Sequence, residues 1–116
     1  MALAEIEAAR VKRVVGSFVQ KRRPPPHIRP KLDVGYRVTG QSVEIFKVRP
    51  AWDGGPSETL EGAVAKATYV RARKCWRIFW MRADLKWHSY DPAPEVASID
   101  EFVALVEEDA NACFWG

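Results

Sequence analysis

The chain has 116 residues, of which 47% are hydrophobic and 28% are charged, and its formal net charge at pH 7 is +3. This length is typical of one domain, spanning residues 1–116, and the hydrophobic content suffices for a small core. No run of about 18 apolar residues occurs, so a transmembrane helix is excluded. Acidic residues near the N-terminus argue against a secretory signal. We therefore expect a cytoplasmic protein that does not associate with membranes.

The residues that usually bind metals and cofactors are sparse. Two cysteines, Cys75 and Cys113, and two histidines, His27 and His88, are too few and too far apart for a zinc-binding set. The sequence has no glycine-rich phosphate loop, no G-x-S-x-G and no H-E-x-x-H pattern. We expect no metal and no cofactor. The missing motifs argue against the common enzyme classes without excluding an unusual enzyme.

The first predicted element is a helix over residues 2–22. Its apolar residues recur at spacings of three and four and would form one stripe, comprising Leu3, Ile6, Val11, Val14, Val15 and Phe18. Gly16 weakens a helix by roughly 1 kcal/mol relative to alanine, which does not outweigh the stripe. The three prolines at 24–26 cannot continue the helix and end it.

A basic segment, residues 10–31, overlaps this helix and the prolines that follow. No acidic residue occurs between Ala8 and Leu32, whereas the sequence after Lys86 has several acidic residues and no lysine or arginine. Compact clusters of cations bind phosphates non-specifically. The predicted nucleic-acid contacts are Lys21, Arg22, Arg23, Arg29 and Lys31. The alternatives are a solvated linker, or a basic helix packed beside an acidic one.

Alternating apolar residues predict three strands, at residues 31–38, 43–49 and 64–73. The first two would pair as a hairpin, and the residues of the first that would face the core are Leu32, Val34, Tyr36 and Val38. Small side chains near the third strand would allow a helix to pack closely on one face, at Ala63, Ala65 and Ala67. The long loop at 51–62 contains Trp52, a candidate lid over a binding site.

The stretch 76–90 contains three of the five tryptophans and predicts a fourth, central strand. Its fifteen residues would extend about 50 Å, beyond the usual length of a strand, so a bend near Ala83 and Asp84 is expected. The face assigned to the core comprises Phe79, Met81, Ala83, Leu85 and Trp87. The opposite face begins with apolar residues and ends with ionisable ones.

These ionisable residues form the candidate catalytic set, which comprises Arg82, Asp84, Lys86, His88 and Tyr90. Together they include the residue types needed to bind a phosphate and to transfer a proton. If they form a site, they should surround one concavity, with Asp84 bonded to Arg82 or Lys86. The alternative is a solvated face of alternating charges, in which each ion pair contributes about 0–1 kcal/mol.

A second helix is predicted at residues 99–109, where Ser98 and Glu101 form a capping box before a helical apolar pattern. The aromatic ending, residues 113–116, is expected to dock on the sheet. The predicted fold class is α+β: a four-stranded antiparallel meander sheet flanked by an N-terminal and a C-terminal helix, in the order α-β-β-β-β-α. Both helices should cover the same face, since each has a single apolar stripe.

The second half of the sequence also carries a family resemblance. The run W-R-I-F-W-M-R-A-D-L-K-W-H-S-Y at 76–90, the pair at 91–92, residues 98–101 and the ending C-F-W-G are its main features. With them, the chain resembles the bacterial family described as domain of unknown function 3024, over nearly its whole length. The resemblance implies a stand-alone bacterial domain without an assigned activity, and therefore no catalytic residues to transfer to this sequence.

Three functions remain open from the sequence. The first is a non-enzymatic nucleic-acid-binding or adaptor module that uses the basic segment, supported by aromatic residues able to stack on bases. The second is a protein-interaction module, such as a homodimer formed through the aromatic C-terminus. The third is a small ribonuclease-like or phosphate-binding enzyme whose working residues would be Arg82, Lys86, His88 and Tyr90.

Overall fold

The computed structural model of the chain describes residues 3–50 and 59–115. One helix lies at each end of the chain and the strands lie between them, so the α+β prediction is confirmed. The elements in chain order are α1 (Glu5–Arg22), β1 (Asp33–Thr39), β2 (Ser42–Pro50), β3 (Thr59–Val70), β4 (Cys75–Met81), β5 (Trp87–Ser89), β6 (Glu95–Val96) and α2 (Ile99–Glu108). The predicted lid residue, Trp52, lies outside the described residues.

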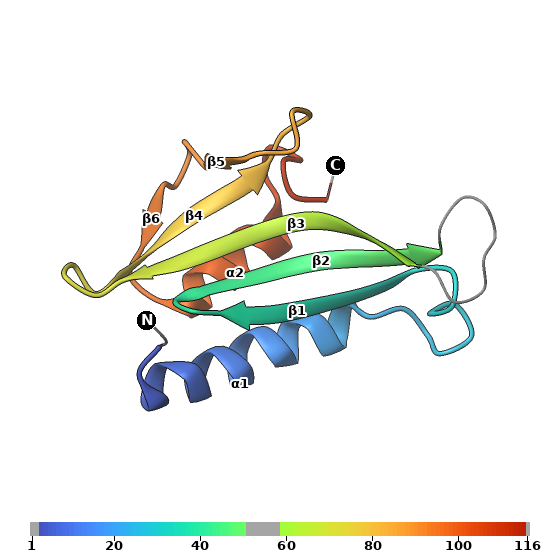
Figure 1. Cartoon of the computed structure of the whole chain (residues 1–116), viewed down its shortest axis with the longest axis horizontal. Helices are drawn as coiled ribbons and strands as arrows, with labels where there is room; N and C mark the ends of the chain where they lie inside the picture. Colours follow the sequence, from blue (N-terminus) through green and yellow to red (C-terminus); the bar gives the residue numbers. More distant parts are fainter. Residues whose placement is uncertain (1–2, 51–58, 116) are drawn as a thin grey trace.

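The described strands form one antiparallel sheet (Figure 1). β1 to β5 lie side by side in the order in which they occur in the sequence, and each pairs with the next. β6 also pairs with β4, at Trp76 and Arg77, whereas β5 pairs with β4 at residues 79–81. The two short strands thus share one edge of β4. The predicted meander is confirmed, with its last strand divided.

The stretch 76–90 is a hairpin rather than one long strand, which corrects the sequence prediction. β4 ends, the chain reverses at residues 82–86, and β5 returns alongside β4. Leu85 adopts a left-handed conformation with φ of 62°, and its N–H donates to the carbonyl of Arg82 at 2.9 Å. The reversal lies at the predicted bend.

The two faces of β4 are also opposite to the prediction. Trp76 and Ile78 are 1% and 0% exposed beneath the helices, whereas Phe79 and Met81 lie on the other side of the sheet. Leu85, which the sequence assigns to the core, is 81% exposed at the tip of the hairpin. The first half of the stretch is apolar at nearly every position, so alternation does not distinguish its two faces.

Both helices pack on the same face of the sheet, as predicted (Figure 1). One cluster of buried residues joins them to the strands, and burial of each large apolar side chain contributes about 1.5–3 kcal/mol. The helical members are Val11, Val15, Phe18, Val19, Ile99, Phe102 and Val106. The members from the strands are Val34, Val43, Ile45, Val64, Ala65, Ala67, Trp76 and Ile78. Neither helix covers the opposite face of the sheet.

α1 occupies most of the predicted helix at 2–22, with a shorter apolar stripe. Its buried residues are Val11, Val15, Phe18 and Val19. Ile6, which the sequence places in the stripe, is 80% exposed. Val11 comes five positions after Ile6, which turns their side chains about 140° apart in a helix with 3.6 residues per turn. The stripe prediction is therefore wrong for Ile6, whereas Leu3 packs against the core cluster as predicted.

The glycine within α1 allows the helix to lie close to β1. A Cβ atom at Gly16 would be 3.2 Å from the hydroxyl oxygen of Tyr36 and 3.7 Å from two of its ring carbons. The first of these distances is shorter than most contacts of a Cβ atom, so Tyr36 would have to shift by a few tenths of an ångström to accommodate a side chain. Close packing of α1 on Tyr36 thus offsets the weak helix propensity of Gly16.

β3 contains one more residue than the part of β2 with which it pairs. Ile45 pairs with Ala65. The next residue of β2, Phe46, pairs with Ala63, so Val64 has no partner of its own. This bulge lets Val64 and Ala65 both reach the core, where they are 1% and 0% exposed. Ala63 therefore lies on the face away from the helices and does not share the predicted alanine face.

α2 begins where the sequence predicts and ends one residue earlier than the predicted range 99–109. The hydroxyl oxygen of Ser98 accepts a hydrogen bond from the backbone N–H of Glu101 at 3.3 Å. The carboxylate of Glu101 accepts one from the backbone N–H of Ser98 at 3.0 Å. Both bonds of the predicted capping box are present, and they fix the start of the helix.

Phe114 and Trp115 of the aromatic C-terminus dock on the core and on α2, and the carbonyl of Trp115 accepts a hydrogen bond from Nζ of Lys47 on β2 at 3.1 Å. Phe114 is 4% exposed, and its ring centre is 4.7 Å from that of Tyr90. The indole N–H of Trp115 donates to the carbonyl of Val106 at 2.9 Å. Asp109 follows α2 in a left-handed conformation, and its carboxylate accepts hydrogen bonds from the backbone N–H groups of Phe114 and Trp115, both at 3.0 Å. Asp109 thus turns the chain back onto the core.

Replacing Asp109 with alanine should lower the free energy of unfolding by about 2–3 kcal/mol. The substitution removes the acceptor of two partly buried N–H groups and leaves alanine in a left-handed conformation. Urea unfolding followed by tryptophan fluorescence measures the change. Asp109→Asn is the control, because asparagine keeps an acceptor oxygen and tolerates the left-handed region. An equal loss in both variants would contradict the role of the carboxylate.

Candidate functional site

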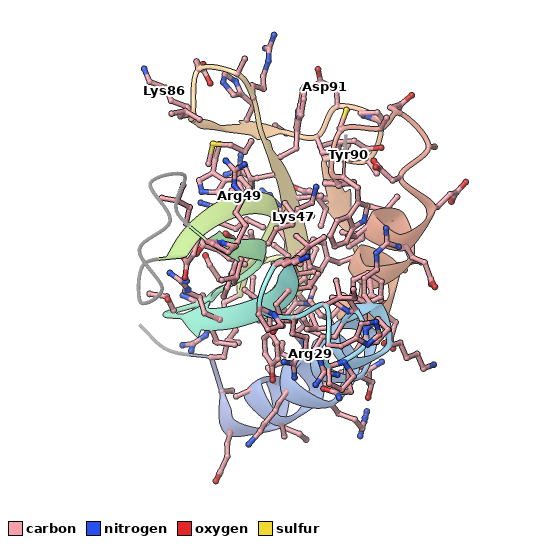
Figure 2. All side chains as sticks on the ribbon, turned by 90° about the vertical axis from the view of Figure 1, so that its right-hand side faces the viewer. Arg29, Lys47, Arg49, Lys86, Tyr90 and Asp91 are labelled. Atoms are coloured by element: carbon pink, nitrogen blue, oxygen red, sulfur yellow. The ribbon has the colours of Figure 1, made fainter. Side chains whose placement is uncertain are left out.

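The structure separates Tyr90 from the rest of the predicted catalytic set. Tyr90 is 2% exposed in the core, and its hydroxyl oxygen accepts a hydrogen bond from Nδ2 of Asn111 at 3.4 Å. Figure 2 shows Lys86 at the outer end of the hairpin, apart from Tyr90. Arg82 is exposed, with its guanidinium carbon 5.6 Å from the ring centre of Trp80. These residues do not surround one concavity.

Asp84 and His88 form a pair on the exposed hairpin. One carboxylate oxygen of Asp84 is 2.8 Å from Nε2 of His88, and the other accepts from the backbone N–H of Lys86 at 3.0 Å. The hydrogen bond with His88, followed by the bond with the Lys86 backbone, lowers the pKa of Asp84 below its usual value. Asp84 therefore closes the turn of the hairpin and does not bind the side chain of Lys86.

Two arginines of the basic segment bind other parts of the fold. Nε and Nη2 of Arg23 donate to the two carboxylate oxygens of Asp33 at 2.9 and 2.8 Å, which ties the end of α1 to the start of β1. These bonds lower the pKa of Asp33 and raise the pKa of Arg23. Nε of Arg29 donates to the carbonyl of Pro24 at 3.0 Å and braces the intervening loop.

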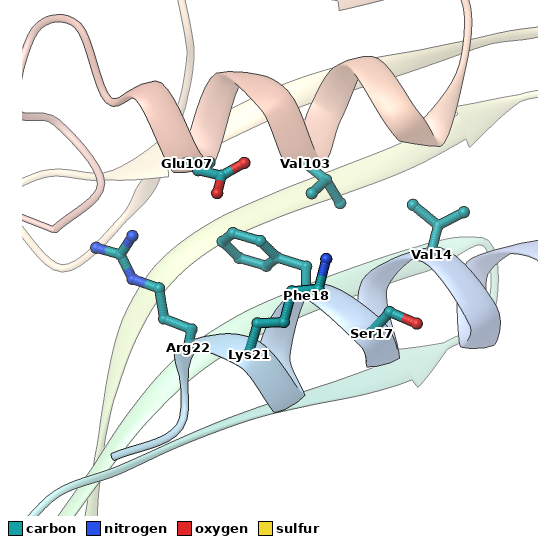
Figure 3. Close-up of a pocket in the computed structure, with 7 residues that line it drawn as sticks. All are labelled: Val14, Ser17, Phe18, Lys21, Arg22, Val103 and Glu107. Carbon is teal, nitrogen blue, oxygen red and sulfur yellow. The ribbon is translucent and has the colours of Figure 1, made fainter. Parts of the chain in front are cut away.

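Lys21 and Arg22 line a groove between the two helices (Figure 3). Glu107 of α2 faces them across this groove, and its negative charge makes the surface less suited to a phosphate. The guanidinium carbon of Arg22 also lies 4.1 Å from the ring centre of Trp115. Lys31 is exposed before the start of β1. Three of the predicted nucleic-acid contacts thus already contact other groups of the fold, namely Arg22, Arg23 and Arg29. The other two, Lys21 and Lys31, are exposed.

The sheet face that neither helix covers, here called the open face, carries aromatic, basic and acidic residues. The strand register arranges them in rows across the sheet. The first row comprises Arg37, Glu44, Lys66, Phe79 and Ser89. The second row, one step further along the strands, comprises Gly35, Phe46, Ala63, Met81 and Trp87. The third row lies on the other side of the first row and comprises Ser42, Thr68 and Arg77.

Three aromatic rings of the open face are half-buried, and each has a cation over it. The guanidinium carbon of Arg37 is 4.5 Å from the ring centre of Phe46. Nζ of Lys66 is 5.0 Å from the ring centre of Phe79 and 5.1 Å from that of Trp87. Each such contact contributes about 0.5–1 kcal/mol at an exposed site. The open face therefore presents rings and cations as an interleaved array.

A depression lies between two of these rings. One wall is Phe46 on β2, and the other is formed by Met81 and Trp87 of the β4–β5 hairpin, with Ala63 of β3 between them. The bulge in β3 brings Ala63 to this face. Gly35 supports the first wall, because a Cβ atom at that position would be 3.0 Å from two carbons of the Phe46 ring. Small residues thus keep the depression open.

Charges of both signs surround the depression. Nη2 of Arg37 forms an ion pair with Glu61, and Glu44 also lines the depression. The hydrogen bond with Glu61 raises the pKa of Arg37. Arg77 adds a further cation, with its guanidinium carbon 5.2 Å from the ring centre of Phe79. The open face can therefore stack flat rings, bind anions and accept hydrogen bonds within one small area.

Sequence reasoning missed the open face because it assigned Phe79, Met81 and Trp87 to the core. A usable signal lies in the first hairpin. Its two-residue turn pairs Thr39 with Ser42, and this register places Arg37 opposite Glu44. An opposite-charge pair is typical of a solvated sheet face, so the turn identifies the face of β1 and β2 that the helices leave uncovered.

For metals and cysteines, the structure speaks only for the residues that it describes. Within 3–50 and 59–115, no group of three or more histidine, cysteine, aspartate or glutamate residues is arranged to hold a metal ion. Cys75 and Cys113 are both free thiols. No helix in the same ranges is long and apolar enough to cross a membrane.

Comparison with protein families identifies a match over nearly the whole chain. A family model described as "Domain of unknown function (DUF3024)" matches residues 3–116. Neither a curated protein nor a solved structure matches the chain. The chain belongs to the DUF3024 family, which confirms the resemblance found in its sequence.

The Arg23–Asp33 pair predicts a pH dependence of stability. Because folding lowers the pKa of Asp33, its contribution is present above the ordinary aspartate value of 3.8 and is lost as the pH falls through the lower folded value. Asp33→Asn should therefore unfold at a lower urea concentration than the wild type at pH 7, with a smaller difference near pH 2.5. Asp91→Asn, at an exposed position, is the control. Equal differences at both pH values would contradict this role of the pair.

Proposed function

We propose that this member of the DUF3024 family is a binding module for single-stranded nucleic acid, which it holds on the open face. The observation that supports the proposal is the array of three half-buried rings with cations over them, on a sheet face that neither helix covers. The rings belong to Phe46, Phe79 and Trp87. Aromatic groups that stay accessible on such a face are typical of a recognition surface.

The chemistry of single-stranded nucleic acid matches this array. Each nucleotide has a flat base, which stacks on an aromatic ring or a guanidinium plane, and a phosphate, which binds a cation. Stacking contributes about 1–3 kcal/mol per base. On the open face, Phe46 and Arg37 offer both kinds of stacking surface in one place, and Lys66 lies within reach of two further rings.

A single strand fits better than a duplex because paired bases stack on each other and hide their flat faces. An antiparallel sheet with its helices on the far side is also the arrangement with which one common class of RNA-binding domain stacks unpaired bases. This likeness is one of arrangement only, and fold alone does not fix function. The proposal therefore rests on the rings and cations of the open face.

The balance of charge suggests that stacking supplies most of the affinity. Arg37, Lys66 and Arg77 are accompanied by Glu44 and Glu61 on the same face, so few phosphates would be neutralised. We infer a moderate affinity with a weaker salt dependence than a purely basic surface would give.

The basic segment remains a second surface for the same ligand. Two of its predicted contacts, Arg23 and Arg29, are engaged with Asp33 and Pro24. A contribution from this segment would depend mainly on Lys21 and Lys31. A cytoplasmic location, which the sequence predicts, would give either surface access to nucleic acid.

Removing a ring from the open face should weaken binding. Phe46→Ala and Trp87→Ala should each raise the dissociation constant for a labelled eight-nucleotide strand about tenfold, within the range expected for one lost stacking contact. Fluorescence polarisation at low salt measures the constants. Urea unfolding of each variant shows whether it remains folded. A wild-type protein that does not bind, or variants that bind as well as the wild type, would refute the proposal.

A pair of lysine variants distinguishes the two surfaces. If the nucleic-acid strand lies on the open face, Lys66→Ala removes one phosphate contact. The slope of log Kd against log salt concentration should then fall by about 0.7, the value for one such contact on single-stranded nucleic acid. Lys21→Ala is the matched control, since it removes the same charge from the helix side. The opposite result would move the site to the basic segment.

A further inference from the structure

Two carboxylates border the depression on the open face, Glu44 and Glu61. A carboxylate beside a chain of phosphates weakens binding through repulsion. On a face for nucleic acid, these groups are favourable only where they meet hydrogen-bond donors. Ionised carboxylates accept hydrogen bonds and cannot donate them. The donors in nucleic acid that match them are the N–H groups on base edges and, in RNA, the 2′-hydroxyl groups.

The depression has room for a flat ring. Phe46 stands on β2, and Met81 stands on β4, two strands away. Neighbouring strands are about 4.8 Å apart, so roughly 10 Å separates the backbones that carry the two walls. Ala63 of β3, which lies between them, projects only a methyl group. A larger residue at position 63 would fill the space into which a ring can enter.

Building on the proposed function, we propose that this depression receives one base of the bound strand and selects guanine. Phe46 and Trp87 contact the faces of the base, while Glu61 or Glu44 contacts its edge from the rim. Guanine presents two neighbouring donors, N1–H and the N2 amino group. These donors match the two oxygens of one carboxylate in a bidentate pair, the geometry in which charged hydrogen bonds are strongest.

The other bases match a carboxylate less well. Cytosine and adenine each present an amino group next to a ring nitrogen that accepts hydrogen bonds. Thymine and uracil present one N–H between two carbonyl oxygens. An acceptor that faces a carboxylate is repelled by it, so these bases form fewer bonds and meet repulsion as well. The expected order of affinity is guanine first, cytosine and adenine next, and thymine or uracil last.

Arg37 holds one of the carboxylates at the depression. Its Nη2 pairs with Glu61, while its guanidinium carbon lies 4.5 Å from the ring centre of Phe46. An ionised carboxylate offers about four acceptor sites, so this ion pair leaves Glu61 able to accept from a base. Glu44 lies directly opposite Arg37 on the neighbouring strand and provides the second acceptor.

The test uses eight-nucleotide oligothymidylates in which one central position is thymine, guanine, cytosine or adenine. Fluorescence polarisation with the full chain at low salt should show that the guanine strand binds about tenfold more tightly than the all-thymine strand. In Glu61→Gln, this ratio of dissociation constants should fall to about two, because an amide donates as well as accepts. In Glu44→Gln, the ratio should also fall, but by less.

Partial unfolding of a variant would weaken the binding of every oligonucleotide by the same factor, so it would not change the ratio of dissociation constants. Glu108→Gln, an exposed change on α2, removes the same charge from the helix layer and should leave the ratio unchanged. If all four strands bind equally, or if the ratio persists in both glutamine variants at the depression, the base selection is wrong while the proposed function stands. If no strand binds, both proposals are wrong.

Discussion

The packing of both helices on one face of the sheet is the constraint on which the rest of the molecule depends. Residues of a strand alternate between faces, so each residue that enters the core places its neighbours on the open face. Burial of Ile45 places Glu44 and Phe46 there, and burial of Ile78 places Phe79 there. A shift of the register by one residue would bury charges and expose the core. The core therefore determines the chemistry of the open face.

The bulge in β3 interrupts this alternation at the place where the depression lies. With Ile45 opposite Ala65, an unbroken strand would put Val64 opposite Phe46 on the open face. Its branched side chain would then stand between the two walls and fill much of the space. The bulge instead sends Val64 into the core and places Ala63 opposite Phe46. One inserted residue thus adds an apolar group to the core and opens a depression on the other face.

The sequence predicts the elements well where a local signal exists. The capping box at Ser98 locates α2, and the short turn before Ser42 defines the first hairpin. The β4–β5 hairpin has a weaker signal, because its turn contains no glycine or proline and places Leu85 in the left-handed region. The turn is closed instead by the carboxylate of Asp84. Without that reversal, alternation assigns Phe79 to the core, and the candidate site is lost with it.

The contacts on the open face also suggest how a ligand would be exchanged. Without a ligand, Arg37 covers Phe46 and Lys66 covers Phe79, so the rings are partly shielded from water by side chains of the same face. Each such contact is worth about 0.5–1 kcal/mol, whereas stacking of a base contributes about 1–3 kcal/mol. A base can therefore displace Lys66 from Phe79 with a net gain, and the lysine is then available to a phosphate, whereas Arg37 stays paired with Glu61. Under the proposed function, the same small difference argues for moderate affinity and ready release of the nucleic-acid strand.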